Sequence, residues 1–110
     1  MKTEELVMKF WKSWQSPADW QEMKSCLGDN YHFDAGMFQA HSAEQAVGIA
    51  QSGNAWKDVE LLDIICRDDK AAIIYQGTDT QSGTRYRVSE FLKIQDHKIQ
   101  GGYGNITILP

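Results

Sequence analysis

A carboxylate interrupts an apolar strand face in the stretch YRVSEFLKI, residues 86–94. Side chains alternate along a strand, so Glu90 shares a face with Val88 and Leu92, while the basic residues of this stretch fall on the other face. Aspartate and glutamate are almost never fully buried unless another group pairs with them. Glu90 is therefore the first candidate for acid–base chemistry.

Two tyrosines are expected beside Glu90. If the turns between the last strands are two-residue loops, Tyr75 and Tyr103 lie opposite Glu90 on the two neighbouring strands, and Leu62 joins the same row. A carboxyl between two phenols on an apolar, helix-covered face is desolvated, which raises its pKa toward the neutral, proton-donating form. The alternative is a Glu90 that reaches solvent at a sheet edge or satisfies the two hydroxyls in a purely structural network.

A helical first half and a strand-rich second half must position these residues. Apolar spacing and capping residues predict three helices, the first capped by Thr3, the second opened by Ser16 and Pro17, and the third by Ser42. Alternating patterns predict an antiparallel meander of strands over residues 59–66, 71–79, 84–95 and 98–108. This order, without a linker or a repeat, predicts one α+β domain over residues 1–110.

Composition argues against several classes of partner. The net charge is -4 and the basic residues are scattered, which argues against nucleic acid and anionic membranes. No apolar run is long enough to span a membrane, and the charged start MKTEELVMKF is unlike a signal peptide, so we expect a cytoplasmic protein. Cys26 and Cys66 lack metal-ligand spacing, and His41 and His97 are expected in loops, so neither a metal nor a cofactor is predicted.

The opposite face of the predicted meander is also apolar. By the same counting it carries Leu61, Ile65, Ile74, Phe91 and Ile106. A contiguous apolar patch on a face that helices leave uncovered favours a homodimer through this surface. A solvated sheet face with charge pairs is the alternative.

Two stretches resemble a known family. SPADWQEMKSCLGDNYHFDAG, residues 16–36, is similar to the helix and short strand of the nuclear transport factor 2-like superfamily, and SEFLKIQDHKIQGGYGN, residues 89–105, is similar to its final hairpin. The resemblance covers nearly the whole chain. It implies a cone-shaped, cystatin-like roll in which three N-terminal helices pack on a strongly curved, mostly antiparallel sheet, the fold of ketosteroid isomerases and SnoaL-like cyclases.

The resemblance to the isomerases implies a partly matched site. Their proton-shuttling carboxylate falls nearest to Asp34, with His32 two residues before it, and Glu90 resembles the protonated acid of their oxyanion hole. The tyrosine of that hole is replaced by Trp11, whose indole donates a hydrogen bond but gives up no proton usefully. The two strand tyrosines would then supply donors to a carbonyl oxygen.

The short strand leaves one choice open. Tyr31 and Phe33 alternate with His32 and Asp34, so only one of these pairs points into the cone unless the strand twists or bulges. The predicted ligand-binding residues are Trp11, Tyr31, Phe33, Leu62, Val88, Leu92 and Asn105.

Two functions are compatible with these predictions. In the first, a small hydrophobic molecule occupies the cone and undergoes isomerase-like or cyclase-like chemistry at a carbonyl. Its predicted catalytic residues are Glu90, Asp34, His32, Tyr75 and Tyr103. In the second, the chain is a non-catalytic ligand-binding module or a dimeric assembly module.

Overall fold

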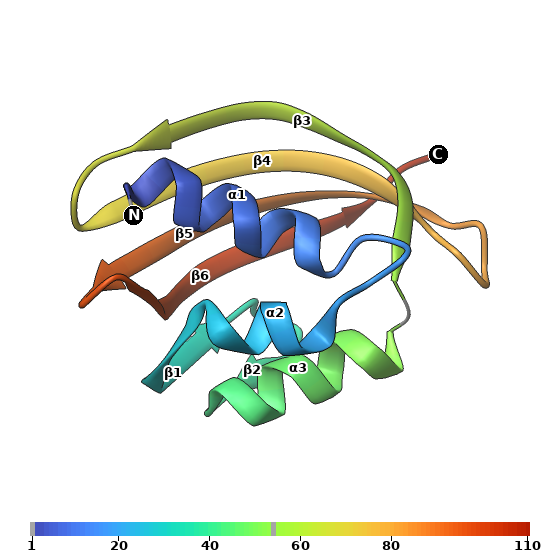
Figure 1. The fold of residues 1–110 in the computed structure, drawn as a ribbon. Helices are drawn as coiled ribbons and strands as arrows, with labels where there is room; N and C mark the ends of the chain where they lie inside the picture. Colours follow the sequence, from blue (N-terminus) through green and yellow to red (C-terminus); the bar gives the residue numbers. More distant parts are fainter. Residues whose placement is uncertain (1, 54) are drawn as a thin grey trace.

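The computed structural model describes residues 2–53 and 55–110 (Figure 1). Within these ranges the elements are α1 (Thr3–Ser13), α2 (Trp20–Ser25), β1 (Leu27–Asp34), β2 (Gln39–Ala40), α3 (Ala43–Ser52), β3 (Trp56–Cys66), β4 (Lys70–Asp79), β5 (Arg85–Gln95) and β6 (Lys98–Ile108). The α+β class and the four-strand antiparallel meander are confirmed. The second helix is shorter than expected.

The strands form one six-stranded sheet in the order β2-β1-β6-β5-β4-β3. β1 runs parallel to β6, and the other neighbouring strands are antiparallel. The long strands curve around α1, while α2 and α3 lie beside each other near β1 (Figure 1). The concave face of the sheet and the apolar side of α1 therefore enclose the interior.

The starts of the first two helices differ from the prediction. α1 has Lys2 at its N-cap with no side-chain capping bond, and Thr3 Oγ1 instead donates to a backbone carbonyl of the β3–β4 turn. α2 is capped by Asp19, whose carboxylate accepts from Glu22 N at 3.1 Å, so the helix begins later than the cap expected at Ser16. Among the described helices none combines the length and the apolar character that crossing a bilayer requires.

The start of α3 is confirmed. Ser42 Oγ accepts a hydrogen bond from Gln45 N at 3.0 Å, which satisfies a free amide of the first turn. The Gln45 side chain reaches back to His41 N at 2.6 Å. These two bonds fix the chain between β2 and α3.

A bulge in the last hairpin changes the predicted register. One extra residue near Gly101 shifts the pairing of β6 against β5, so Tyr103 pairs with Phe91 and Glu90 pairs with Gly104. A slip of one residue moves a side chain to the opposite face. Tyr103 consequently lies on the outer face and is 57% exposed, and the prediction that it flanks Glu90 is wrong.

The other two hairpins also depart from the predicted register, the first of them inside β3 rather than at its turn. A register shift in β3 pairs Leu61 with Tyr75, so Leu62 lies on the outer face, and its predicted place beside Glu90 is wrong. The β4–β5 turn is longer than two residues and pairs Tyr75 with Val88. Because this shift is an even number of residues, Tyr75 and Glu90 still share the inner face.

Candidate functional site

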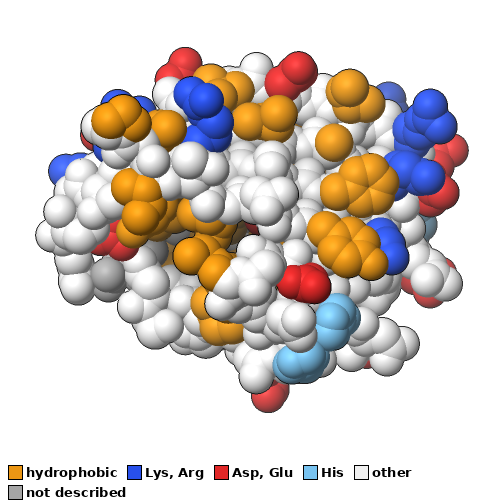
Figure 2. All heavy atoms as spheres, turned by 180° about the vertical axis from the view of Figure 1, so that it is seen from behind, with side chains coloured by type: hydrophobic (Ala, Val, Ile, Leu, Met, Phe, Trp, Pro, Cys, Tyr) orange, Lys and Arg blue, Asp and Glu red, His pale blue; other side chains and the backbone are white. Residues whose placement is uncertain are grey.

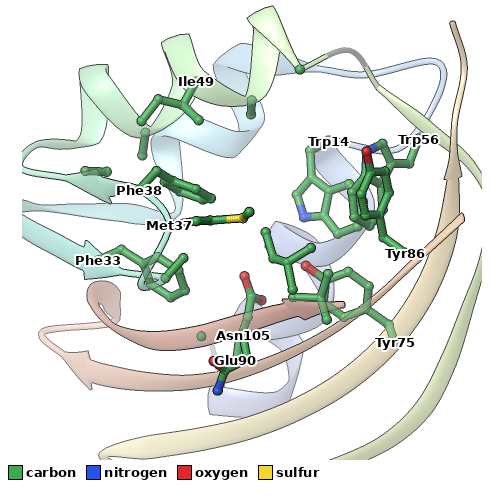
Figure 3. Close-up of a pocket in the computed structure, with 18 of the residues that line it drawn as sticks. Trp14, Phe33, Met37, Phe38, Ile49, Trp56, Tyr75, Tyr86, Glu90 and Asn105 are labelled. Carbon is green, nitrogen blue, oxygen red and sulfur yellow. The ribbon is translucent and has the colours of Figure 1, made fainter. Parts of the chain in front are cut away.

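A cavity of about 740 Å³ lies between the concave face of the sheet and the helices (Figure 3). This volume falls within the range of small-molecule sites. Most of the lining is apolar or aromatic and includes Phe10, Trp14, Met23, Phe33, Phe38, Ile49, Trp56 and Val88. The enclosure comes from packing curved strands against short helices, which leaves space that the side chains do not fill.

Glu90 supplies the polar centre of this cavity. Its carboxyl group points into the cavity, beside the Tyr75 hydroxyl (Figure 3). Burial raises the pKa of Glu90 from 4.5 to about 7, although the hydrogen bond from Tyr75 acts in the opposite direction. Near neutral pH the carboxyl group is therefore present in both its acid and its ionised form.

Two phenols near Glu90 remain protonated. Burial raises the pKa of Tyr75 well above its usual value, and the Glu90 charge and the hydrogen bond to Glu90 raise it further. Burial, with a smaller effect of Glu90, also raises the pKa of Tyr31. Tyr75 therefore acts as a hydrogen-bond donor rather than as a proton acid at neutral pH.

Stacked aromatic rings form one wall of the cavity. Trp56 stacks on Tyr86 with ring centroids 5.2 Å apart, and Trp14 meets Trp56 edge-on at 5.7 Å. Trp14 also contacts the Tyr75 ring at 5.1 Å. These contacts hold the Tyr75 ring, so its hydroxyl has a fixed direction toward Glu90.

Charges in the cavity lining are acidic only. Among the described lining residues, Asp79 and Glu90 are the ionisable carboxyls, and no lysine, arginine or histidine is present. The Asp79 carboxylate accepts hydrogen bonds from the amides of Gln81 and Ser82, each at 2.8 Å, in the β4–β5 turn. The part of the lining that the structure describes therefore offers no cation to pair with an anionic ligand.

Apart from Leu62, which lies on the outer face, the predicted ligand-binding residues divide into three groups. Tyr31, Phe33 and Val88 line the cavity. Leu92 and Trp11 are buried in the core without lining it, and the indole Nε1 of Trp11 has no hydrogen-bond partner among the described residues. Asn105 borders the cavity, but it pairs with Ser89, so strand alternation directs its side chain to the outer face.

The structure does not bring the second predicted acid–base group to Glu90. Tyr31 and Phe33 are the inward pair of β1, and His32 is exposed. Asp34 lies outside the lining, and its carboxylate accepts a hydrogen bond from Gly36 N at 2.8 Å. Of the predicted catalytic residues, Glu90 and Tyr75 alone share the cavity.

Several lining residues were not predicted as part of a site. Trp14 and Trp56 border the cavity, although aromatic residues in such patterns usually pack in a core. Met37 and Phe38 line it from the loop after β1, where no periodic pattern exists to indicate a direction. Tyr86 lies on the same face of β5 as Glu90, so the alternation of side chains along this strand could have identified it as a lining residue.

Comparison with known proteins gives the class of the fold. No protein-family model and no curated protein matches the sequence. An NTF2-like protein of unknown function from Cytophaga hutchinsonii superposes with a TM-score of 0.80 at 14% identity, covering 100% of this chain and 92% of that one. The chain therefore has the NTF2-like fold, as the sequence resemblance implied.

Two further similar structures carry names that mention an activity. A candidate ketosteroid isomerase from Kribbella flavida superposes with a TM-score of 0.80 at 14% identity, covering 96% of this chain and 78% of that one. An LEH-like epoxide hydrolase from M. tuberculosis gives a TM-score of 0.77 at 12% identity, covering 94% and 80%. At this identity the likeness establishes the fold, and function must be argued from the site.

Proposed function

We propose that this protein binds a neutral, largely apolar small molecule whose carbonyl or hydroxyl oxygen is held by Glu90 and Tyr75. The observation that carries the proposal is one desolvated carboxyl–phenol pair in an apolar cavity of about 740 Å³. A protonated Glu90 donates a hydrogen bond to a carbonyl oxygen, and such a bond is strong in a low-dielectric site. The aromatic wall supplies flat apolar contact area for a ring system.

The charge of the lining determines which ligands are rejected. A carboxylate ligand would face Glu90 and Asp79 without a lining cation, so it would lose hydration without compensation. A neutral ketone with the same carbon skeleton avoids this cost. Discrimination between the two is therefore the characteristic property of the proposed site.

Binding is tested with matched ligands on the full chain. A steroid ketone and a carboxylate of the same ring skeleton are titrated by calorimetry and by thermal unfolding at neutral pH. We expect the ketone to raise the Tm, since a ligand at about 100 times its Kd adds about 2.7 kcal/mol to folding stability, and we expect the carboxylate to have no effect. Glu90→Gln should weaken ketone binding by about tenfold.

Glu60→Gln is the matched control for this experiment. Glu60 belongs to the same sheet but is exposed, and it accepts a hydrogen bond from Gln76, an interaction that an amide oxygen preserves. Ketone affinity should be unchanged in this variant. A broad set of neutral ketones that never stabilises the protein, or a Glu90→Gln variant with full affinity, would contradict the proposal.

Acid–base catalysis is the second candidate function. A pKa of about 7 is well matched to proton transfer at neutral pH. Glu90 would remove a proton from the carbon next to a carbonyl and return it, while Tyr75 stabilises the oxygen. Incubating the same neutral ketones with the protein in D₂O tests this second function. Deuterium uptake at that carbon that depends on Glu90 supports catalysis, and no uptake means that the site only binds its ligand.

A homodimer through the outer face of the sheet is the assembly we propose. Ile65, Phe91 and Tyr103 lie in one row across this face and are 66%, 43% and 57% exposed. Figure 2 views the molecule from behind, where hydrophobic side chains lie between basic and acidic ones. A second copy related by a twofold axis would bury the row. A cytoplasmic location stays a prediction.

Phe91→Glu should convert the proposed dimer into a monomer. The substitution places a charge in the middle of the apolar row, where dimerisation would bury and desolvate it. Sedimentation velocity at micromolar concentration measures the change, and circular dichroism verifies the fold. Ile108→Glu is the control, because Ile108 is 67% exposed but lines the cavity on the other face. A wild-type protein that sediments as a monomer would refute this assembly.

A further inference from the structure

Two histidines lie against each other outside the cavity. His32 is on β1 and His41 immediately precedes the cap of α3. Their Nδ1 atoms are 3.2 Å apart, and the ring centroids are 4.8 Å apart at an interplanar angle of 50°. Both side chains are exposed, and two histidine side chains are in contact at the surface in Figure 2.

The backbone on both sides of the pair is held in place. His32 pairs with Gly101 of β6, and the strands approach so closely there that a Cβ at Gly101 would lie 1.7 Å from the His32 carbonyl oxygen. His41 N donates to the Gln45 side chain at 2.6 Å, next to the cap of α3. The two imidazoles are therefore brought together by the fold rather than by a flexible loop.

We infer that His32 and His41 chelate one divalent transition-metal ion through their Nδ1 atoms. Zinc–imidazole bonds are about 2.0–2.1 Å long, so two nitrogens on a tetrahedral ion lie about 3.4 Å apart. The observed 3.2 Å, at which the two neutral rings share a hydrogen bond, is within a few tenths of this value, so an ion would take the place of the shared proton. Neutral imidazole is a good ligand for zinc, nickel and copper.

The remaining coordination positions would be filled by water. Within the described ranges no group of three or more histidine, cysteine, aspartate or glutamate side chains could hold a metal ion. A site with two protein ligands binds more weakly than a closed four-ligand site, so we expect a Kd on the order of micromolar. The net charge of -4 favours the approach of a cation.

The test uses zinc alone on the full chain near pH 7.5. Calorimetry should give one equivalent of Zn²⁺ per chain, and histidine side-chain NMR should show shifts for His32 and His41 but not for His97. The sequence contains three histidines, so His97→Ala is the matched control. His32→Ala and His41→Ala should each lower the affinity at least tenfold, while His97→Ala should not change it.

Two outcomes would overturn this inference. Equal zinc affinity in all three single variants would mean that the ion binds elsewhere. Half an equivalent of zinc with a zinc-dependent increase in sedimentation rate would mean that the ion bridges two copies. Circular dichroism of each variant ensures that a loss of binding is not a loss of fold.

Discussion

Glu90→Gln should make the folded protein about 2 to 3 kcal/mol more stable than the wild type near pH 8 and nearly equal to it near pH 4.5. The reason is that burial raises the pKa of Glu90 from 4.5 to about 7, so ionising this group in the folded protein has a cost. An amide copies the shape of the neutral carboxyl and never ionises. The variant is therefore free of that cost.

The sign of the pH dependence follows from proton linkage. A folded pKa above the unfolded one gives a contribution to stability that is complete below about pH 4.5 and is lost as pH rises to about 7. In this window the unfolded chain has released the proton while the folded chain retains it. Above about pH 7 both states are ionised, and the difference between wild type and variant becomes constant.

Urea unfolding from about pH 4.5 to pH 8.5 measures this difference. The wild-type and Glu90→Gln curves of unfolding free energy should separate across the window, while Glu60→Gln, an exposed carboxyl on the same sheet, should follow the wild type. Carbon-13 NMR of the Glu90 carboxyl gives the folded pKa directly. If the wild-type and Glu90→Gln curves run parallel and the Glu90 pKa is near 4.5, the carboxyl is solvated. Glu90 would then not act as a neutral hydrogen-bond donor near pH 7.

Gly101→Ala should be among the most destabilising single substitutions in the chain, with a loss of more than about 3 kcal/mol. The backbone at Gly101 has φ +117°, which residues with a side chain rarely adopt. An added Cβ would lie 1.7 Å from the carbonyl oxygen of His32 on β1. Relief of this clash would require β1 and β6 to separate.

Gly48→Ala is the matched control for this prediction. Gly48 lies inside α3, and an added Cβ there meets no atom within 4 Å. Alanine is favoured over glycine in a helix by up to about 1 kcal/mol, so this variant should be as stable as the wild type or more stable. Urea midpoints compare the two variants, and a Gly101→Ala protein within about 1 kcal/mol of the wild type would show that β6 needs no glycine there.

The bulge at Gly101 also explains why the predicted site was only partly correct. Alternation of side chains along β5 is a local property, and it correctly predicts that Glu90, Val88 and Tyr86 share one face. Pairing between strands is not local, because one extra residue in β6 moves Tyr103 to the other face. The glycines were visible in the sequence, but their backbone angles were not.

The sequence by itself determined the order of the helices and strands apart from the two-residue β2, the inward carboxyl at Glu90 and the resemblance to a cone fold. These features depend on local spacing, capping and alternation. The tertiary structure alone decided that β1 runs parallel to β6, that His32 and Asp34 lie outside the cavity, and that the loop carrying Met37 lines it. Each of these depends on contacts between segments distant in sequence, which the curvature of the sheet and its bulges bring together.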